Sequence, residues 1–214
     1  MLAILDYKAG NQTSVLRALQ HLGIPAAITA DKTELSGAEG IIFPGVGSAS
    51  QAMGVLQSQG LDIFLKEAVA RQQPLLGICL GCQILLESSE EGPVQTLGIL
   101  QGHCKKFPDT LQQPDGTHAP VPHMGWNSVV LEKDSELFAG VDKDAQFYFV
   151  HSYYVEPAPE LATGFTEYGG MRFCSFYGRP GLWATQFHLE KSSRAGQIVL
   201  KNFYNYCKEH SHAV

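Results

Sequence analysis

The chain has 214 residues, of which 44% are hydrophobic and 17% are charged, and its formal net charge is −6. A chain of this length can bury a full hydrophobic core, and we expect residues 1–214 to form one domain. The negative charge gives no reason to expect a nucleic-acid partner. No apolar run approaches the ~20 residues that a membrane span requires, so we expect no membrane partner.

The number of cysteines and the N-terminal residues indicate in which cellular compartment the protein is expected. The five cysteines are an odd number, and residues 1–6 lack the basic region and long apolar stretch of a signal peptide. Free thiols in a chain without a secretion signal are typical of a reducing compartment, so we expect a cytoplasmic protein.

The first two-thirds of the chain alternates short apolar runs with helical patterns. Residues 1–5 predict a strand, and a helical pattern of apolar residues follows and ends at Gly23. The run 41–43 predicts a buried strand that stops before Pro44, and apolar positions between 61 and 69 predict a helix. This order favours an α/β fold with a doubly wound, mostly parallel sheet and flanking helices.

The pattern changes from about residue 98. Residues 107–122 are rich in Pro, Gln, Asp and Gly and predict an exposed loop. Strands are predicted beyond it at 126–131, 147–150 and 182–187. Residues 171–177 are expected to pair with the last of these across a Gly/Pro turn, so the sheet should carry an antiparallel extension. A helix with one apolar face follows, and the histidine-containing tail at His210 and His212 is expected to fray.

The most informative stretch is Leu75 to Gly81, an apolar run that ends in Cys79 between two glycines. It predicts a strand followed by a helix, with the cysteine at a sharp, strained turn where glycines let neighbouring backbone pass closely. A thiol at a helix N-terminus is favoured as the thiolate. A buried and inert cysteine is the alternative interpretation.

Cys79 and Cys82 also form a C-x-x-C pair. The remaining cysteines supply no second pair, which argues against a zinc site; they are Cys104, Cys174 and Cys207. A redox dithiol stays an alternative, and it requires Cys82 for activity.

A cysteine nucleophile needs a base, and the base needs an orienting group. His188 follows a predicted strand, and Glu190 lies two residues later. Open α/β sheets gather their sites at such strand ends. An exposed histidine with a solvated glutamate is the plainer interpretation. Other histidines beside strand-like segments stay candidates: His103, His123 and His151.

Acyl-transfer chemistry also needs donors for a developing oxyanion. The backbone N–H of Leu80 follows the nucleophile and is one candidate. The strip Gly45-Val46-Gly47 follows another predicted strand and could supply a second, although Pro-Gly also suits a simple tight turn. A phosphate-binding loop is disfavoured because no Lys-Ser/Thr follows.

Together these motifs resemble the class I glutamine amidotransferases. The segment Gly77 to Gln83 and the triplet His188-Leu189-Glu190 match their Cys-His-Glu pattern in order and spacing. Within the family, five stretches resemble the glutaminase subunits of imidazole glycerol phosphate synthases in histidine biosynthesis: 6–11, 43–47, 123–127, 148–153 and 186–192. The resemblance therefore covers nearly the whole chain.

The resemblance implies a glutaminase without metal or cofactor. Cys79 would attack L-glutamine and form a γ-glutamyl thioester, His188 would transfer protons, and Glu190 would orient His188. The oxyanion would be held by Leu80 and by the strip Gly45, Val46 and Gly47, which in the family can point the wrong way until the partner binds. Glutamine would be bound by Gln83, Ser152 and Tyr153.

The resemblance also implies a partner. Ammonia would pass to a (β/α)₈-barrel cyclase/synthase subunit in a heterodimer, which makes imidazole glycerol phosphate and aminoimidazole carboxamide ribotide. The matching interface positions are Asn11, Trp126, Tyr148 and Lys191. Their plainer interpretations are a helix cap for Asn11, strand packing for the two aromatics and a solvated charge for Lys191.

Two departures from the family pattern stand out. Leu189 replaces the proline that usually lies between the histidine and the glutamate, which frees φ there. Lys8-Ala9 replaces smaller residues in the N-terminal loop. Two competing functions stay open: a glutaminase for another synthase, such as those making anthranilate or GMP, and a non-catalytic regulatory subunit. Against the first, little chain follows Glu190 to form a fused synthase domain; against the second, all three triad residues are present.

Overall fold

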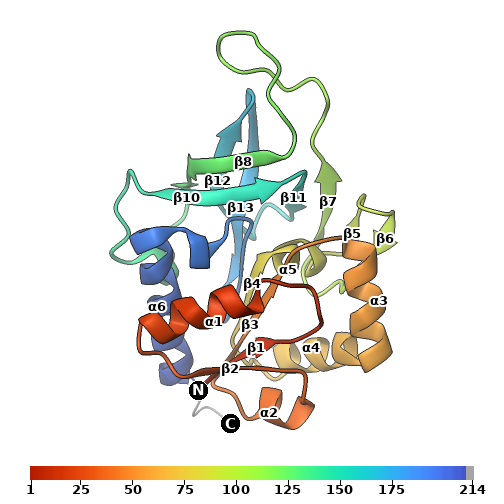
Figure 1. The fold of residues 1–214 in the computed structure, drawn as a ribbon, viewed down its shortest axis with the longest axis vertical. Helices are drawn as coiled ribbons and strands as arrows, with labels where there is room; N and C mark the ends of the chain where they lie inside the picture. The colour runs from red at the N-terminus through yellow and green to blue at the C-terminus, as the bar shows by residue number, and fades with distance from the viewer. Residues whose placement is uncertain (211–214) are drawn as a thin grey trace.

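The computed structural model describes residues 1–210, so the tail residue His212 lies outside the described part. A parallel sheet forms its centre (Figure 1). The strands follow the order β2-β1-β3-β4-β14 and are β1 (Leu2–Leu5), β2 (Ala26–Thr29), β3 (Gly40–Gly45), β4 (Leu75–Cys79) and β14 (Leu182–Thr185). The carboxyl ends of β3, β4 and β14 therefore meet at one edge of the sheet.

Helices cover both faces of this sheet. On one face lie α1 (Gln12–His21) and α6 (Ser193–His210); on the other lie α2 (Lys32–Ser36), α3 (Ala49–Gln59), α4 (Leu61–Ala70) and α5 (Leu80–Ile84). Successive side chains of a strand point to opposite faces, so Leu2 and Ile4 pack with the first group while Ala3 and Leu5 pack with the second. The predicted doubly wound α/β fold is confirmed.

The predicted antiparallel extension is also confirmed. β13 (Met171–Arg179) runs antiparallel to β14, with Phe176 opposite Thr185. Within the described residues the sheet reaches twelve strands. The added strands are β5 (Ser88–Ser89), β6 (Val94–Gln95), β7 (Gly102–Lys106), β9 (Val130–Leu131), β11 (Tyr153–Pro157) and β12 (Ala162–Tyr168).

A separate two-stranded ribbon lies above the edge where the parallel strands end (Figure 1). It consists of β8 (His123–Ser128) and β10 (Gln146–His151), which pair antiparallel with Tyr148 opposite Trp126. A short 3₁₀ helix, η2 (Leu189–Lys191), follows β14 and contacts the ribbon through a bridge between Tyr148 and His188. A second 3₁₀ helix, η1 (Glu136–Phe138), packs against α6.

Several predicted boundaries were wrong. β3 continues through Pro44 and Gly45, because a proline is tolerated near a strand end and Gly45 still lies in register with Cys79. The expected strand 126–131 is split between two sheets at Val129. The segment 107–122 is irregular as predicted, yet it is not wholly exposed: Phe107, Leu111 and Ala119 are buried in the core. Tail residue His210 belongs to α6 and stacks on Tyr206.

Within residues 1–210 no helix is long and apolar enough to cross a membrane. The same residues hold no group of three or more histidine, cysteine or acidic side chains arranged to bind a metal ion.

Candidate active site

Cys79 ends β4 and begins the turn into α5. Its φ of 55° and ψ of −108° form a strained backbone conformation for a residue with a side chain. The flanking glycines make this turn fit: a Cβ at Gly81 would overlap the Phe43 carbonyl oxygen, and one at Gly77 would lie 2.8 Å from a Leu85 methyl. The predicted strand–nucleophile–helix turn is confirmed, with the helix beginning at Leu80.

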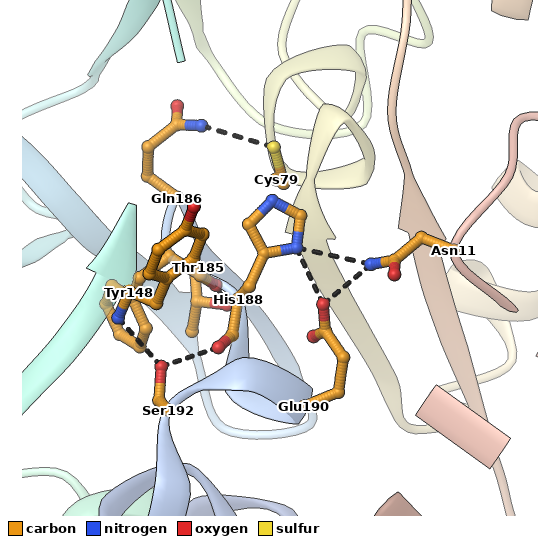
Figure 2. Close-up of polar contacts among 9 residues, drawn as sticks. Asn11, Cys79, Tyr148, Thr185, Gln186, His188, Glu190 and Ser192 are labelled. Atoms are coloured by element: carbon orange, nitrogen blue, oxygen red, sulfur yellow. Dashed lines mark hydrogen bonds and ion pairs between the residues drawn. The ribbon is translucent and has the colours of Figure 1, made fainter. Parts of the chain in front are cut away.

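His188 lies where β14 ends and is placed against this turn. Its Nδ1 is 2.7 Å from Glu190 Oε1, and both side chains are fully buried. Figure 2 shows the other ring nitrogen pointing toward the Cys79 thiol. The structure thus brings together the three residues of the predicted triad.

Electrostatics favours a charged pair within this group. Burial alone lowers the pKa of His188, but the negative charge of a Cys79 thiolate and the hydrogen bond to Glu190 raise it to about 10. Burial alone raises the pKa of Glu190, but its contacts with His188 and with the Asn11 amide lower it. The arrangement therefore stabilises an imidazolium between two anions.

Asn11 joins the triad, a contact that the sequence did not predict. Its Nδ2 donates to Glu190 Oε1 at 2.6 Å and lies 3.2 Å from His188 Nδ1 (Figure 2). Asn11 precedes α1 in a left-handed conformation, but its side chain makes no capping hydrogen bond. Asn11 is thus the N-cap residue of α1 by position, but its side-chain amide fixes one oxygen of the glutamate instead of capping the helix.

A pocket of about 330 Å³ opens onto Cys79. Its lining contains most of the predicted oxyanion and glutamine-binding residues: Val46, Gly47, Leu80, Gln83, Ser152 and Tyr153. Gln83 Nε2 donates to the Tyr153 carbonyl and to Gln186 Oε1, each at 3.1 Å, and Gln186 Nε2 lies 3.8 Å from Cys79 Sγ. The pocket volume suits a small-molecule substrate.

The other histidines predicted as candidate bases form hydrogen bonds with groups other than Cys79. His151 lines the pocket, but its Nδ1 bonds the Tyr153 carbonyl at 2.8 Å and its Nε2 bonds His123 at 3.1 Å. Burial lowers the pKa of His151 to about 3 and that of His123 to about 4. His103 bonds Ser88 at another part of the surface. Of these four candidate histidines, His188 alone combines a carboxylate partner with a ring nitrogen directed at the thiol.

Cys82 is a buried core residue and is poorly suited to redox chemistry with Cys79. All five cysteines are free thiols, and Cys82 lies on α5 and is fully buried in the core. Burial raises the pKa of its thiol well above the usual value, which disfavours the thiolate that dithiol exchange requires. Its carbonyl accepts a hydrogen bond from Tyr177.

The predicted oxyanion strip is closed in this structure. The Val46 N–H donates to the Ala9 carbonyl at 2.9 Å, so it is not directed into the pocket. Gly47 has a φ of 104°, which only glycine adopts readily. The Leu80 N–H lies at the start of α5, next to the nucleophile.

Three of the four predicted interface residues lie together on the ribbon side. Trp126 is 49% exposed and so lies outside the core, and the strand packing expected of the two aromatics occurs on the surface of the ribbon. Its ring meets Tyr148 edge-on with 6.0 Å between centroids, and Lys191 Nζ lies 5.8 Å from the centre of the Tyr148 ring.

Sequence reasoning missed two residues of the candidate site, one buried beside Cys79 and one on the pocket wall. Gln186 contacts the nucleophile, and its place in the Gln186-Phe187-His188 run at a strand end was the available signal. Glu91 lines the pocket while its Oε2 accepts the Ala49 N–H at 2.8 Å. Nothing in the local sequence distinguishes Glu91 from its neighbour Glu90.

Residues 3–206 match the family model for glutamine amidotransferase class-I. The chain belongs to the class-I glutamine amidotransferase family. It is 61% identical over 209 residues to imidazole glycerol phosphate synthase subunit HisH of Desulfovibrio desulfuricans, which covers 98% of this chain and 96% of that protein. It is 58% identical over 213 residues to subunit HisH of Maridesulfovibrio salexigens, covering 100% of both. This amidotransferase therefore groups with the HisH subunits.

Solved structures agree on the fold of this amidotransferase. One described as a glutamine amidotransferase has a TM-score of 0.72 at 17% identity and covers 97% of this chain and 98% of its own. PurLQS from Thermotoga maritima has a TM-score of 0.69 at 17% identity, covering 96% and 97%.

Proposed function

We propose that the chain is the glutaminase subunit of an imidazole glycerol phosphate synthase, hydrolysing L-glutamine to glutamate and ammonia in histidine biosynthesis. One observation carries this proposal: Cys79, at a strained turn, faces the ring of His188, which is hydrogen-bonded to buried Glu190. Family membership supports glutamine as the substrate, and the HisH relatives support the pathway.

The chemistry follows from this geometry. The Cys79 thiolate attacks the side-chain amide carbon of glutamine, and the carbonyl electron pair moves onto oxygen. Protonated His188 gives its proton to the amide nitrogen, so the C–N bond breaks, ammonia leaves and a γ-glutamyl thioester remains. Neutral His188 then takes a proton from water, whose oxygen attacks the thioester; glutamate and the thiolate are released. Glu190 orients the ring and balances its charge throughout.

Oxyanion stabilisation requires a rearrangement. The Leu80 N–H can serve as it stands, but the Val46 N–H is held by Ala9. We propose that the peptide between Gly45 and Val46 rotates when the partner docks, which turns this N–H toward the substrate oxygen. The low steric barrier at Gly45 allows the rotation. The isolated chain should therefore hydrolyse glutamine slowly.

Glutamine binding is proposed to involve Gln83, Ser152 and Tyr153, with an additional contact from Glu91. Among the described residues that line the pocket there is no lysine or arginine, and Glu91 supplies the one carboxylate. A carboxylate on the wall attracts the α-ammonium group of the amino acid. Glu91 would thus fix the end of the substrate remote from Cys79.

The proposed partner is a (β/α)₈-barrel cyclase/synthase subunit that forms a heterodimer with this chain in the cytoplasm. Exposed apolar side chains support a docking face near the pocket: Val46 is 42% exposed, Trp126 49% and Met124 61%. Asn11, Tyr148 and Lys191 are proposed to contribute at its border. We also propose that residues 1–214 act as one amidotransferase domain without metal or cofactor.

Glutamate release by the purified chain, alone and with the synthase subunit and its ribonucleotide ligand, tests the proposal. We expect strong stimulation by the partner and a loss of about 10³-fold or more in Cys79→Ala. The matched control Cys82→Ser should keep most of its activity. Stimulation by a different synthase would reassign the partner, and full turnover in Cys79→Ala or loss of activity in Cys82→Ser would overturn the mechanism.

A further inference from the structure

The backbone of His188 is fixed by hydrogen bonds that the catalytic mechanism does not use. Its N–H donates to the Tyr148 carbonyl at 2.9 Å, and its carbonyl accepts the Ser192 hydroxyl at 2.5 Å. The same hydroxyl oxygen accepts the Tyr148 N–H at 3.0 Å. These three bonds form a closed ring among Tyr148, His188 and Ser192, and Figure 2 shows the two that pass through Ser192, below the imidazole.

The donor directions in this ring are fixed. A backbone N–H can only donate and a carbonyl can only accept, so the single Ser192 proton must go to His188. Ser192 is 1% exposed and His188 is fully buried, which leaves no water to replace a missing bond. A buried backbone group without a partner is costly, so the ring resists any separate movement of its three members.

The ring connects the catalytic histidine to the exposed face of the ribbon. Tyr148 lies on β10, and its ring contacts both Trp126 and Lys191 on the outside of the molecule. Lys191 directly precedes Ser192. A partner that binds to this aromatic face therefore contacts β10, the strand whose backbone is hydrogen-bonded to His188.

We propose that Ser192 is a positioning residue that holds His188 against Cys79 and transmits partner contact at the ribbon to the catalytic histidine. This inference rests on the proposed function, because it takes Cys79 and His188 as the reacting pair. Ser192 does not line the pocket, so it should affect the chemical step rather than glutamine binding.

Ser192→Ala tests the proposal, with Thr185→Val as the matched control. Thr185 Oγ1 donates to the Phe187 carbonyl at 3.1 Å, so this variant also removes a buried hydroxyl near His188, at the end of β14, but leaves the ring intact. With the synthase partner, Ser192→Ala should lower kcat about ten- to hundredfold, the range that a small misplacement of a catalytic group produces. KM for glutamine should stay within about twofold of wild type, and the affinity for the partner should stay within about threefold. Thr185→Val should keep kcat within about twofold.

A second readout uses the isolated chain. The rate of Cys79 alkylation by iodoacetamide, followed by peptide mass spectrometry across pH, reports how well His188 stabilises the thiolate. In Ser192→Ala the alkylation rate at neutral pH should fall by about fivefold or more, because His188 is no longer held against the thiol. If that variant does not fold, Ser192→Cys, which fills similar space with a weak donor, should show a smaller fall in this rate.

The outcomes separate the two proposals. A wild-type chain that the partner does not stimulate counts against the proposed function, while the alkylation profile still tests Ser192. An unchanged alkylation profile and kcat, with only a lower Tm as in Thr185→Val, would overturn the positioning role.

Discussion

Two parts of the active site differ in their readiness for catalysis. Around Cys79 the parts are in place: His188 points at the thiol and Glu190 is bonded to the ring at 2.7 Å. At the strip before α3, the Val46 N–H is bonded to Ala9 and turned away from the pocket. In the proposed mechanism, this difference lets the nucleophile be in place without continuous hydrolysis of glutamine, because the second oxyanion donor is not yet available.

The two parts also differ in how they are built. Cys79 and His188 lie at ends of neighbouring parallel strands, where paired backbone and two packed cores restrict movement. Val46 and Gly47 are exposed, and the Val46 N–H makes one backbone hydrogen bond, to the Ala9 carbonyl. A net hydrogen bond contributes only about 1 kcal/mol, so docking contacts can readily outweigh it.

For the comparison between the strip and the triad, the largest change in kcat is expected from a variant that alters the strip and leaves the triad intact. Val46→Pro removes the N–H that we propose to rotate toward the oxyanion. We expect partner-stimulated kcat to fall about 10²-fold, the usual loss for one oxyanion donor, while slow turnover by the isolated chain changes little. Steady-state kinetics with and without the partner measures both.

Val46→Ala serves as the control, since it retains the N–H and should retain stimulation. If Val46→Pro were stimulated as strongly as wild type, the strip would not be the withheld donor. The comparison between a prepared triad and a closed strip would then fail.

How much of this site the sequence predicts depends on the range of the interactions. The turn at Cys79 is local: the clashes that Gly77 and Gly81 avoid arise within a few residues or with the adjacent strand, so the glycine spacing predicts them. The doubly wound sheet follows from hydrophobic periodicity for the same reason. The choice of His188 among several histidines required the family resemblance, because strand order decides which one reaches the thiol.

The orientation of individual polar groups could not be predicted from the sequence. Asn11 was assigned to the interface, yet its amide bonds Glu190 across 179 positions of the chain. The direction of the Val46 N–H depends on one peptide plane, and the ring through Ser192 depends on how the ribbon sits over β14. Leu189 keeps the turn despite replacing proline, since its buried side chain packs in the core beside α6. Such details follow from tertiary packing and have no residue pattern of their own.

A smaller change, in KM for glutamine, is expected from a variant of Glu91 on the pocket wall. Glu91→Gln keeps an oxygen to accept the Ala49 N–H but removes the charge. We expect KM for glutamine to rise about tenfold with kcat nearly unchanged, since a charge-assisted contact to the α-ammonium would be lost. Initial-rate measurements in the stimulated complex give both constants.

Glu90→Gln is the matched control. Glu90 is the neighbouring carboxylate, but it bonds the Lys106 N–H and does not line the pocket. Equal changes in KM for the two variants would contradict a specific contact between Glu91 and the substrate.

The smallest effect concerns the stability of the prepared triad, and its sign follows from the pKa directions. The pKa of His188 is raised, so its contribution to the free energy of unfolding is complete below about 6.5 and is lost as pH rises toward about 10. The pKa of Glu190 is lowered from 4.5, so its contribution is complete above that pH and is lost as pH falls further. Urea unfolding should therefore find Glu190→Gln less stable than wild type by about 1 kcal/mol near pH 5.5, the difference between charged and neutral hydrogen bonds.

That difference should shrink steadily between about pH 6.5 and pH 9.5, because above pH 6.5 the unfolded chain releases the proton that folded His188 still retains, so the charged pair adds less to the free energy of unfolding. Glu67→Gln is the control, since Glu67 pairs with Arg71 at an exposed surface site and its variant should stay within about 0.5 kcal/mol at every pH. A difference for Glu190→Gln that is constant from pH 5.5 to 9.5 would mean that the glutamate stabilises the fold through packing alone. The triad would then owe its readiness to the strand ends and to the ring through Ser192, and the charge of Glu190 would serve the chemical step only.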